Sequence, residues 1–149
     1  KLLEGHAVAR ACERMTASDL ERIIQHNEQF NLYAVKGNMK KAMIENQRFH
    51  FSIYQCADSS TLTDMIESQW IKVGPTIAKY IGQHALRNTD TFNINTSKHL
   101  KLISALENHD PISALNALTS ILDITANYLF NSLNHDTKQS SSTLNEIWK

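Results

Sequence analysis

Apolar residues recur at intervals of three and four along most of this chain, the spacing that places them on one face of an α-helix. In residues 1 to about 15 these positions are Leu2, Leu3, Ala7, Val8, Ala11 and Cys12. Similar stripes run from residue 18 to about 36, from 39 to about 57, and from 60 onward. No stretch shows the alternation of apolar and polar residues that is typical of a strand. The pattern therefore predicts an all-α protein.

Capping residues, glycine and proline predict where the helices begin and end. Ser18, followed three residues later by Glu21, predicts a capping box at the start of the second helix. Gly37-Asn38 predicts the end of that helix, because both residues adopt a left-handed conformation readily. Asp110-Pro111 is typical of a helix start. Gly74-Pro75 falls inside the fourth apolar stripe and predicts a kink there.

The second half of the chain contains two polar segments. Residues 87–96 are polar and rich in turn-forming types, so we expect a loop there, followed by a fifth helix from Asn95 to Asn108. The last helix is expected from Pro111 to about Leu133. The composition of residues 137–149 indicates a flexible tail. We therefore expect an antiparallel bundle of about six helices over residues 1–136 and a flexible tail over 137–149.

The composition fits one globular domain and argues against two classes of partner. Of the 149 residues, 42% are hydrophobic, and fifteen basic residues balance fifteen acidic ones. A chain without net charge lacks the broad basic surface that dominates non-specific binding to DNA. It also has no apolar run of about 18 residues, so we expect no membrane-spanning helix. Without a signal peptide at its start, it is expected to be part of a longer cytoplasmic protein.

The candidate chemistry lies in the third and fifth predicted helices. Asn46 and His50 are four residues apart and share one helical face, which also carries apolar residues. His99 lies in similar surroundings further along the chain. Such polar groups form either a buried hydrogen-bonded set or part of a ligand pocket. By residue type alone, a histidine on an apolar face is more often a buried structural group than a ligand.

Read in order, the chain contains several short motifs of one known family. They are Leu3-Glu4-Gly5, the segment Ala9 to Thr16, Ser18-Asp19-Leu20, Asn46-Gln47-Arg48-Phe49-His50, Gln69-Trp70, and His99 to Leu106 followed by Asp110 and Ala114. Over about residues 2 to 135 the chain resembles the FadR C-terminal (FCD) effector-sensing domain of GntR-superfamily transcription regulators. Each motif is weak alone, and the resemblance depends on their order and spacing.

This resemblance implies a fold, partners and a mode of action. Domains of this family are antiparallel helical bundles that sense a small organic acid and help the regulator form a homodimer. DNA is bound by a winged helix-turn-helix domain, which is expected before Lys1 and lies outside this chain. No membrane partner is implied.

The resemblance also implies a divalent metal site, from which this sequence departs at two positions. Asn46 stands where the family has an aspartate, while His50 and His99 match the first and second histidines. Ile121 stands where the third histidine is expected, 22 residues after His99. An amide is a neutral ligand and isoleucine is no ligand. The remaining set of Asn46, His50 and His99 predicts at most weak binding of Zn²⁺ or Ni²⁺.

We therefore expect an effector-binding and dimerisation domain in which Asn46, His50, His99 and Ile121 line the pocket. One alternative is a structural dimerisation module whose pocket has decayed, which the two lost metal ligands make credible. A metal-dependent helical-bundle enzyme is a weaker alternative. The sequence has no nucleophile with a neighbouring base, no paired acidic residues suited to acid–base catalysis and no glycine-rich phosphate loop.

Overall fold

A computed structural model describes the course of the chain over residues 1–85 and 89–147, and the side chains of residues 1–77, 96–127 and 129–130. This part of the chain consists of helices and short turns and contains no strand, which confirms the all-α prediction. Its helices are α1 (Leu2–Arg14), α2 (Ala17–Val35), α3 (Met39–Gln55), α4 (Ser60–Ala85), α5 (Thr89–Glu107) and α6 (Pro111–Ile147).

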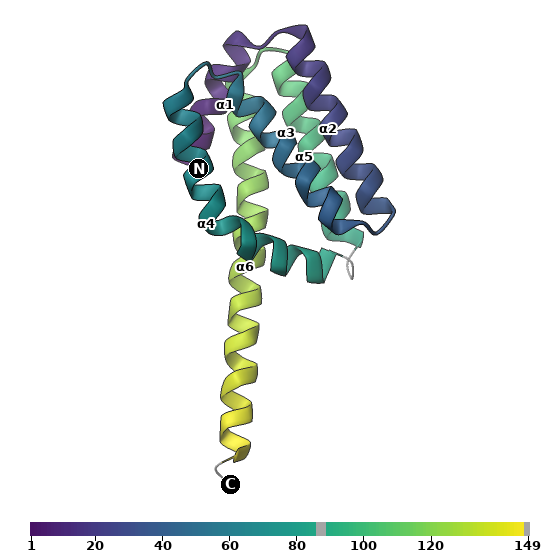
Figure 1. Cartoon of the computed structure of the whole chain (residues 1–149), viewed down its shortest axis with the longest axis vertical. Helices are drawn as coiled ribbons and strands as arrows, with labels where there is room; N and C mark the ends of the chain where they lie inside the picture. The colour runs from purple at the N-terminus through teal and green to yellow at the C-terminus, as the bar shows by residue number, and fades with distance from the viewer. Residues whose placement is uncertain (86–88, 148–149) are drawn as a thin grey trace.

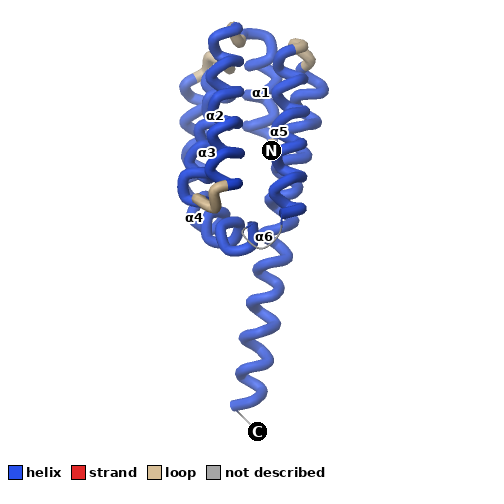
Figure 2. The backbone as a smooth tube through the Cα atoms, turned by 90° about the vertical axis from the view of Figure 1, so that its right-hand side faces the viewer, coloured by secondary structure: helices blue, strands red, loops and turns tan. Residues whose placement is uncertain are grey.

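The helices form an antiparallel bundle, as the sequence predicts (Figure 1). The most extensive packing is between α2 and α3 and between α5 and α6, and α1 packs against both α6 and α3. The view turned by 90° shows the same bundle with α6 leaving it at one end as a single helix (Figure 2). Within the described residues, no helix combines the length and the apolar character needed to cross a membrane.

One apolar core joins α1, α3, α5 and α6, with contributions from α2 and α4. Its buried members include Val8, Ile23, Phe49, Ile53, Tyr54, Ile66, Leu102, Leu106, Leu118 and Ile121. Removing this much apolar surface from water is the main driving force for folding, at roughly 25 cal/mol per Å². Polar residues are few in this interior, and those that are buried include Asn27, His50 and His99.

The helix ends are capped locally, in one case by a different pair from the expected one. The capping box of α2 is formed by Thr16 and Asp19, and not by Ser18 and Glu21. The Asp19 backbone N–H donates to the Thr16 hydroxyl at 3.2 Å, and the Thr16 N–H donates to the Asp19 carboxylate at 3.0 Å. Since α2 begins at Ala17, Ser18 already lies inside the helix and cannot cap it.

Two other predicted caps are confirmed. Gly37, after the end of α2, has a φ angle of 71°, the left-handed conformation expected there. At the start of α6, the Asp110 carboxylate accepts the backbone N–H groups of Ile112 and Ser113 at 3.1 and 3.0 Å.

The predicted loop at residues 87–96 is wrong for its larger part, because α5 begins at Thr89. Residues 87–88 lie outside the described part of the chain. Polar residues disfavour a helix by only about 0.7 kcal/mol each or less, so continuity with a packed helix can override that preference. The kink predicted at Gly74-Pro75 agrees with the structure: Pro75 lies inside α4, and this helix changes direction part-way along its length (Figure 1).

The last helix is also longer than the sequence pattern indicates. It was expected to end near Leu133, with a flexible tail over residues 137–149, but α6 continues to Ile147. Residues 112–147 contain neither glycine nor proline, so nothing in the sequence interrupts the helical backbone. The extension projects beyond the bundle (Figures 1 and 2).

Candidate ligand-binding site

Two histidines from different helices meet in the interior of the bundle. His50 comes from α3 and His99 from α5, and their side chains are only 2% and 1% exposed. The centroids of their rings are 5.6 Å apart, with the rings nearly perpendicular. Phe49 stacks on His99 at 4.3 Å and contacts His50 edge-on at 5.2 Å. The structure therefore brings together the two histidines that the sequence singles out, on an aromatic support.

His99 is oriented by a buried amide from a third helix. Asn27 of α2 lies 2.9 Å from His99, measured from the side-chain oxygen of Asn27 to Nδ1 of His99. Because an amide oxygen only accepts hydrogen bonds, Nδ1 of His99 carries the proton and donates it. A neutral imidazole has one N–H, so Nε2 of His99 is left with a free lone pair.

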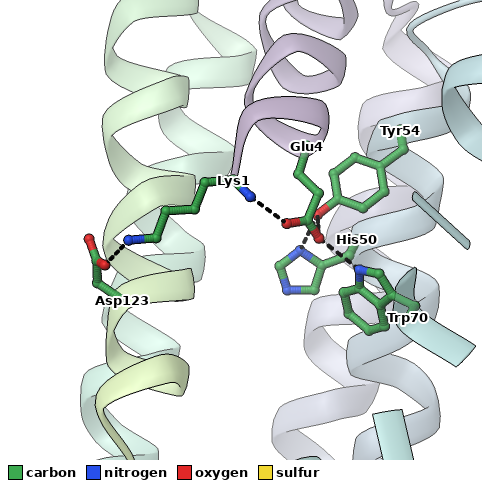
Figure 3. A network of polar contacts seen from close by, with 6 residues as sticks. All are labelled: Lys1, Glu4, His50, Tyr54, Trp70 and Asp123. Atoms are coloured by element: carbon green, nitrogen blue, oxygen red, sulfur yellow. Dashed lines mark hydrogen bonds and ion pairs between the residues drawn. The ribbon is translucent and has the colours of Figure 1, made fainter. Parts of the chain in front are cut away.

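His50 belongs to a second polar network, drawn in Figure 3. Its Nδ1 lies 3.4 Å from the Tyr54 hydroxyl, one helical turn further along α3. The Tyr54 hydroxyl donates to the carboxylate of Glu4 in α1 at 3.2 Å. The same carboxylate oxygen accepts the indole N–H of Trp70, from α4, at 2.7 Å. His50, Tyr54, Glu4 and Trp70 therefore connect three helices at one point.

Burial keeps both histidines neutral at ordinary pH. Loss of water, and to a lesser extent the nearby His99, lowers the pKa of His50 to about 3. Burial also lowers the pKa of His99 to about 4. The pKa of Tyr54 is raised well above its usual value, first by burial and then by the negative charge of Glu4. The site thus offers neutral imidazoles and a protonated phenol.

The other two predicted pocket residues, Asn46 and Ile121, are joined to the histidines by no described hydrogen bond. Asn46 lies one turn before His50 on α3 and is only partly buried. Among the described residues, no hydrogen bond joins Asn46 to either histidine. Ile121 is buried on α6 and belongs to the same apolar core as Phe49. It contributes apolar surface to the interior of the bundle.

These geometries can be compared with proteins of known kind. A family model for the FCD domain matches residues 1–123. The chain belongs to the FCD domain family. The HTH-type transcriptional regulator McbR of Escherichia coli (strain K12) is 34% identical over 73 residues, which are 49% of this chain and 33% of that protein. The solved structure of E. coli McbR/YncC matches with a TM-score of 0.80 at 26% identity, over 87% of this chain and 63% of that one.

The comparisons identify this chain as an FCD domain that is similar to part of an HTH-type transcriptional regulator. They confirm the family resemblance seen in the sequence. The chain spans about a third of the McbR sequence in the alignment, and 63% of the solved McbR/YncC chain. The match therefore supports the domain type directly, while the activity of a whole regulator is a separate question.

The sequence predicts two imidazoles and the Asn46 amide as ligands for a metal in this FCD domain, and the structure brings the two imidazoles together. Each histidine uses Nδ1 in a hydrogen bond, which is how proteins usually orient a metal-binding imidazole whose Nε2 faces the ion. Within the described residues, no three His, Cys, Asp or Glu side chains gather closely enough to hold a metal. The set fits a weakly held ion and does not fit a site closed by three or four charged or imidazole ligands.

Several residues of this site were missed by sequence reasoning. Asn27 was detectable, because it interrupts the apolar stripe of α2 between Ile23 and Phe30 at helical spacing. Glu4 and Trp70 lie in motifs that carry the family resemblance, but nothing in the sequence indicates that they meet. They lie 66 residues apart in the chain, and only the packing of α1 against α4 brings their side chains within a hydrogen bond.

Proposed function

We propose that this FCD domain is the effector-binding and dimerisation domain of a bacterial GntR-family transcription regulator. It senses a small organic acid and alters how a winged helix-turn-helix domain, located before residue 1 in the whole protein, binds operator DNA. The match to McbR, whose name describes an HTH-type transcriptional regulator, supports this proposal. The effector acts by population shift: it binds one arrangement of the bundle more tightly and so favours it in the homodimer.

The observation that carries the proposal is the pair of buried neutral histidines. His50 and His99 are held through Nδ1, and no described hydrogen bond uses Nε2 of either ring. Burying polar groups costs free energy unless they are paired. Two neutral imidazoles with ring centroids 5.6 Å apart in an apolar core are suited to a polar ligand or to a cation that binds their free ring nitrogens.

An effector carboxylate also needs positive charge, which neutral histidines do not supply. We propose that His50 and His99 hold Zn²⁺ or Ni²⁺ weakly, with the Asn46 amide oxygen as a third ligand. When bound, the ion supplies the charge that the carboxylate requires. Ile121 keeps one side of the site apolar, which suits the carbon skeleton of an organic acid.

Thermal unfolding tests this proposal. The chain is melted with and without Zn²⁺ or Ni²⁺, crossed with a panel of small carboxylates. A ligand present at about a hundred times its dissociation constant adds roughly 2.7 kcal/mol, or very roughly 5–10 °C for a domain of this size. We expect the largest rise with metal and acid together. His50→Ala and His99→Ala should each abolish the rise relative to their own ligand-free melts.

His6→Ala is the matched control, since His6 is exposed on α1 and lies outside the site. It should keep the full ligand-induced rise. A rise with acid alone would replace the metal-assisted site by a metal-free one. No rise under any condition would contradict the sensor proposal for these ligands and favour a structural dimerisation module.

A further inference from the structure

We propose that Glu4 is a positioning residue of the effector site: through Tyr54, its carboxylate fixes the tautomer of His50 that leaves Nε2 free to accept a ligand. The inference deepens the proposed function and rests on it for the identity of the site. Glu4 lies on a different helix from His50 and does not touch its ring by any described hydrogen bond. Its action is therefore indirect.

The first step is the role of the Glu4 carboxylate as an acceptor. Its side chain is only 13% exposed, so water can supply few of the hydrogen bonds that its oxygens accept. The indole nitrogen of Trp70 lies 2.7 Å from Oε1 of Glu4. An indole N–H can only donate a hydrogen bond. The Tyr54 hydroxyl lies 3.2 Å from the same oxygen. This carboxylate oxygen has no hydrogen of its own, so it accepts from both Trp70 and Tyr54. The hydrogen of the Tyr54 hydroxyl therefore points to Glu4.

The second step follows from counting hydrogens on Tyr54. The hydroxyl has one hydrogen, and it is given to the closer and negatively charged partner, Glu4. The hydroxyl oxygen is left to accept, and Nδ1 of His50 at 3.4 Å is the donor that faces it. Nδ1 then carries the single proton of the neutral ring. Nε2 is unprotonated, and it points away from this network in Figure 3.

The third step is that the alternative tautomer would not serve the proposed metal-assisted site. Were the Tyr54 hydrogen directed at His50, Nδ1 would accept it and Nε2 would carry the proton. An N–H at Nε2 can neither bind a cation nor accept from an effector. The ring centroid of Trp70, whose indole N–H donates to the same Glu4 carboxylate, lies 5.5 Å from that of His50, so Glu4 also positions a neighbour of this ring.

The position of Glu4 is itself supported from both sides of α1. Lys1, the N-cap residue directly before α1, pairs with Asp123 of α6, as Figure 3 shows. The start of α1 is thus attached to α6 on one side and to α3 and α4 on the other. Because the Glu4 carboxylate is held in place, it can determine the orientation of the Tyr54 hydroxyl.

The test reads the tautomer directly, without an effector. In the chain labelled with nitrogen-15 histidine, the ring nitrogen shifts of His50 distinguish a protonated from an unprotonated Nε2. We expect Nδ1–H in the wild type and a shift to Nε2–H in Glu4→Leu, where Tyr54 loses its acceptor. Glu4→Gln keeps an acceptor oxygen and should preserve the wild-type tautomer. Glu13→Leu, an exposed change on the same helix, is the matched control.

Tyr54→Phe provides a second test if Glu4→Leu does not fold, because it removes the link while leaving the contact between Glu4 and Trp70. It should also lose the preference for Nδ1–H. A wild-type ring protonated at Nε2, or an unchanged tautomer in a folded Glu4→Leu or Tyr54→Phe protein, would overturn the proposal. A merely structural role for Glu4 would lower stability in these variants without moving the tautomer.

Titration with Zn²⁺ alone separates this inference from the proposed function. If the wild type binds the ion, Glu4→Leu should bind it about 10–100-fold more weakly, the usual effect of removing a group that orients a metal ligand. An unchanged affinity would contradict the positioning role. Absence of Zn²⁺ binding by the wild type would count against the proposed metal site, while the tautomer measurement would still decide the role of Glu4.

Discussion

At the scale of single residues, burial decides the charge of the two central histidines. Neither His50 nor His99 has an acidic partner within the described hydrogen bonds: one faces the Tyr54 hydroxyl and the other the Asn27 amide. Without a negative charge to stabilise the imidazolium, the loss of water dominates and lowers the pKa of both rings. The same residue type on the surface would be partly protonated near neutrality.

This charge state predicts how folding stability depends on pH. In the folded chain the pKa values of His50 and His99 are about 3 and about 4, against 6.5 without burial. The unfolded state therefore takes up protons first as the pH falls. Their contribution to stability is complete above about pH 6.5 and is lost as the pH falls through about 4 for His99 and about 3 for His50, each with a slope of up to about 1.4 kcal/mol per pH unit.

Urea denaturation between pH 7.5 and 4.5 measures this slope. His50→Gln should reduce it by about 1.4 kcal/mol per pH unit in the lower part of the range, because one titrating group is gone. His6→Gln, an exposed change, should leave the slope within error of the wild type. Equal slopes in the wild type and His50→Gln would show that the buried ring is not held neutral.

At the scale of helices, caps and interruptions set the boundaries, and their positions depend on small geometric differences. Both Thr16-Ala17-Ser18-Asp19 and Ser18-Asp19-Leu20-Glu21 offer a hydroxyl followed by a carboxylate three residues later. In the structure, Thr16 and Asp19 form the capping box. Met15 is extended, and Thr16 directly after it is the N-cap residue of α2. Sequence spacing identified the region of the cap correctly and its register incorrectly.

Two alanine variants test the register of this cap. Thr16→Ala removes the hydroxyl that accepts the Asp19 N–H, so it should cost about 1 kcal/mol of unfolding free energy. Ser18→Ala should change it by less than about 0.5 kcal/mol, since Ser18 is exposed inside α2. Chemical denaturation at neutral pH measures both. The opposite ranking would restore the capping box expected from the sequence.

At the scale of the whole molecule, the bundle and the end of α6 are built differently. The first part of α6 packs against α1 and α5, and Leu118 and Ile121 are buried there. Further along, α6 leaves the bundle and continues as a single helix (Figure 2). An isolated helix of this length is only marginally stable in water, because it has little packing to offset the cost of ordering its backbone.

Ending the chain at residue 136 tests whether this extension contributes to the stability of the bundle. We expect the melting temperature to change by less than about 2 °C, because 1 kcal/mol corresponds to about 2–4 °C in a protein of this size. The helical signal in circular dichroism should fall with the residues removed. A drop of more than about 5 °C, or a change in sedimentation at the same protein concentration, would instead assign the extension a role in packing or in the homodimer.

The sequence by itself determined the helical class, the approximate number of helices and the candidate histidines. These follow from local rules: the period of the apolar stripes, the caps at Gly37 and Asp110, and the proline in α4. The family motifs added the domain type. The stripes and caps depend on residues a few positions apart, and the domain type depends on the order and spacing of the motifs along the chain. Neither requires knowledge of how the helices pack.

Only the tertiary structure decided what the histidines are attached to and what charge they carry. Asn27 reaches His99 across 72 residues of sequence, and Tyr54 reaches Glu4 across 50. The pKa values depend on burial by helices that are distant in the chain. Such contacts arise from packing and desolvation, which act between side chains that are close in space but unrelated in sequence order.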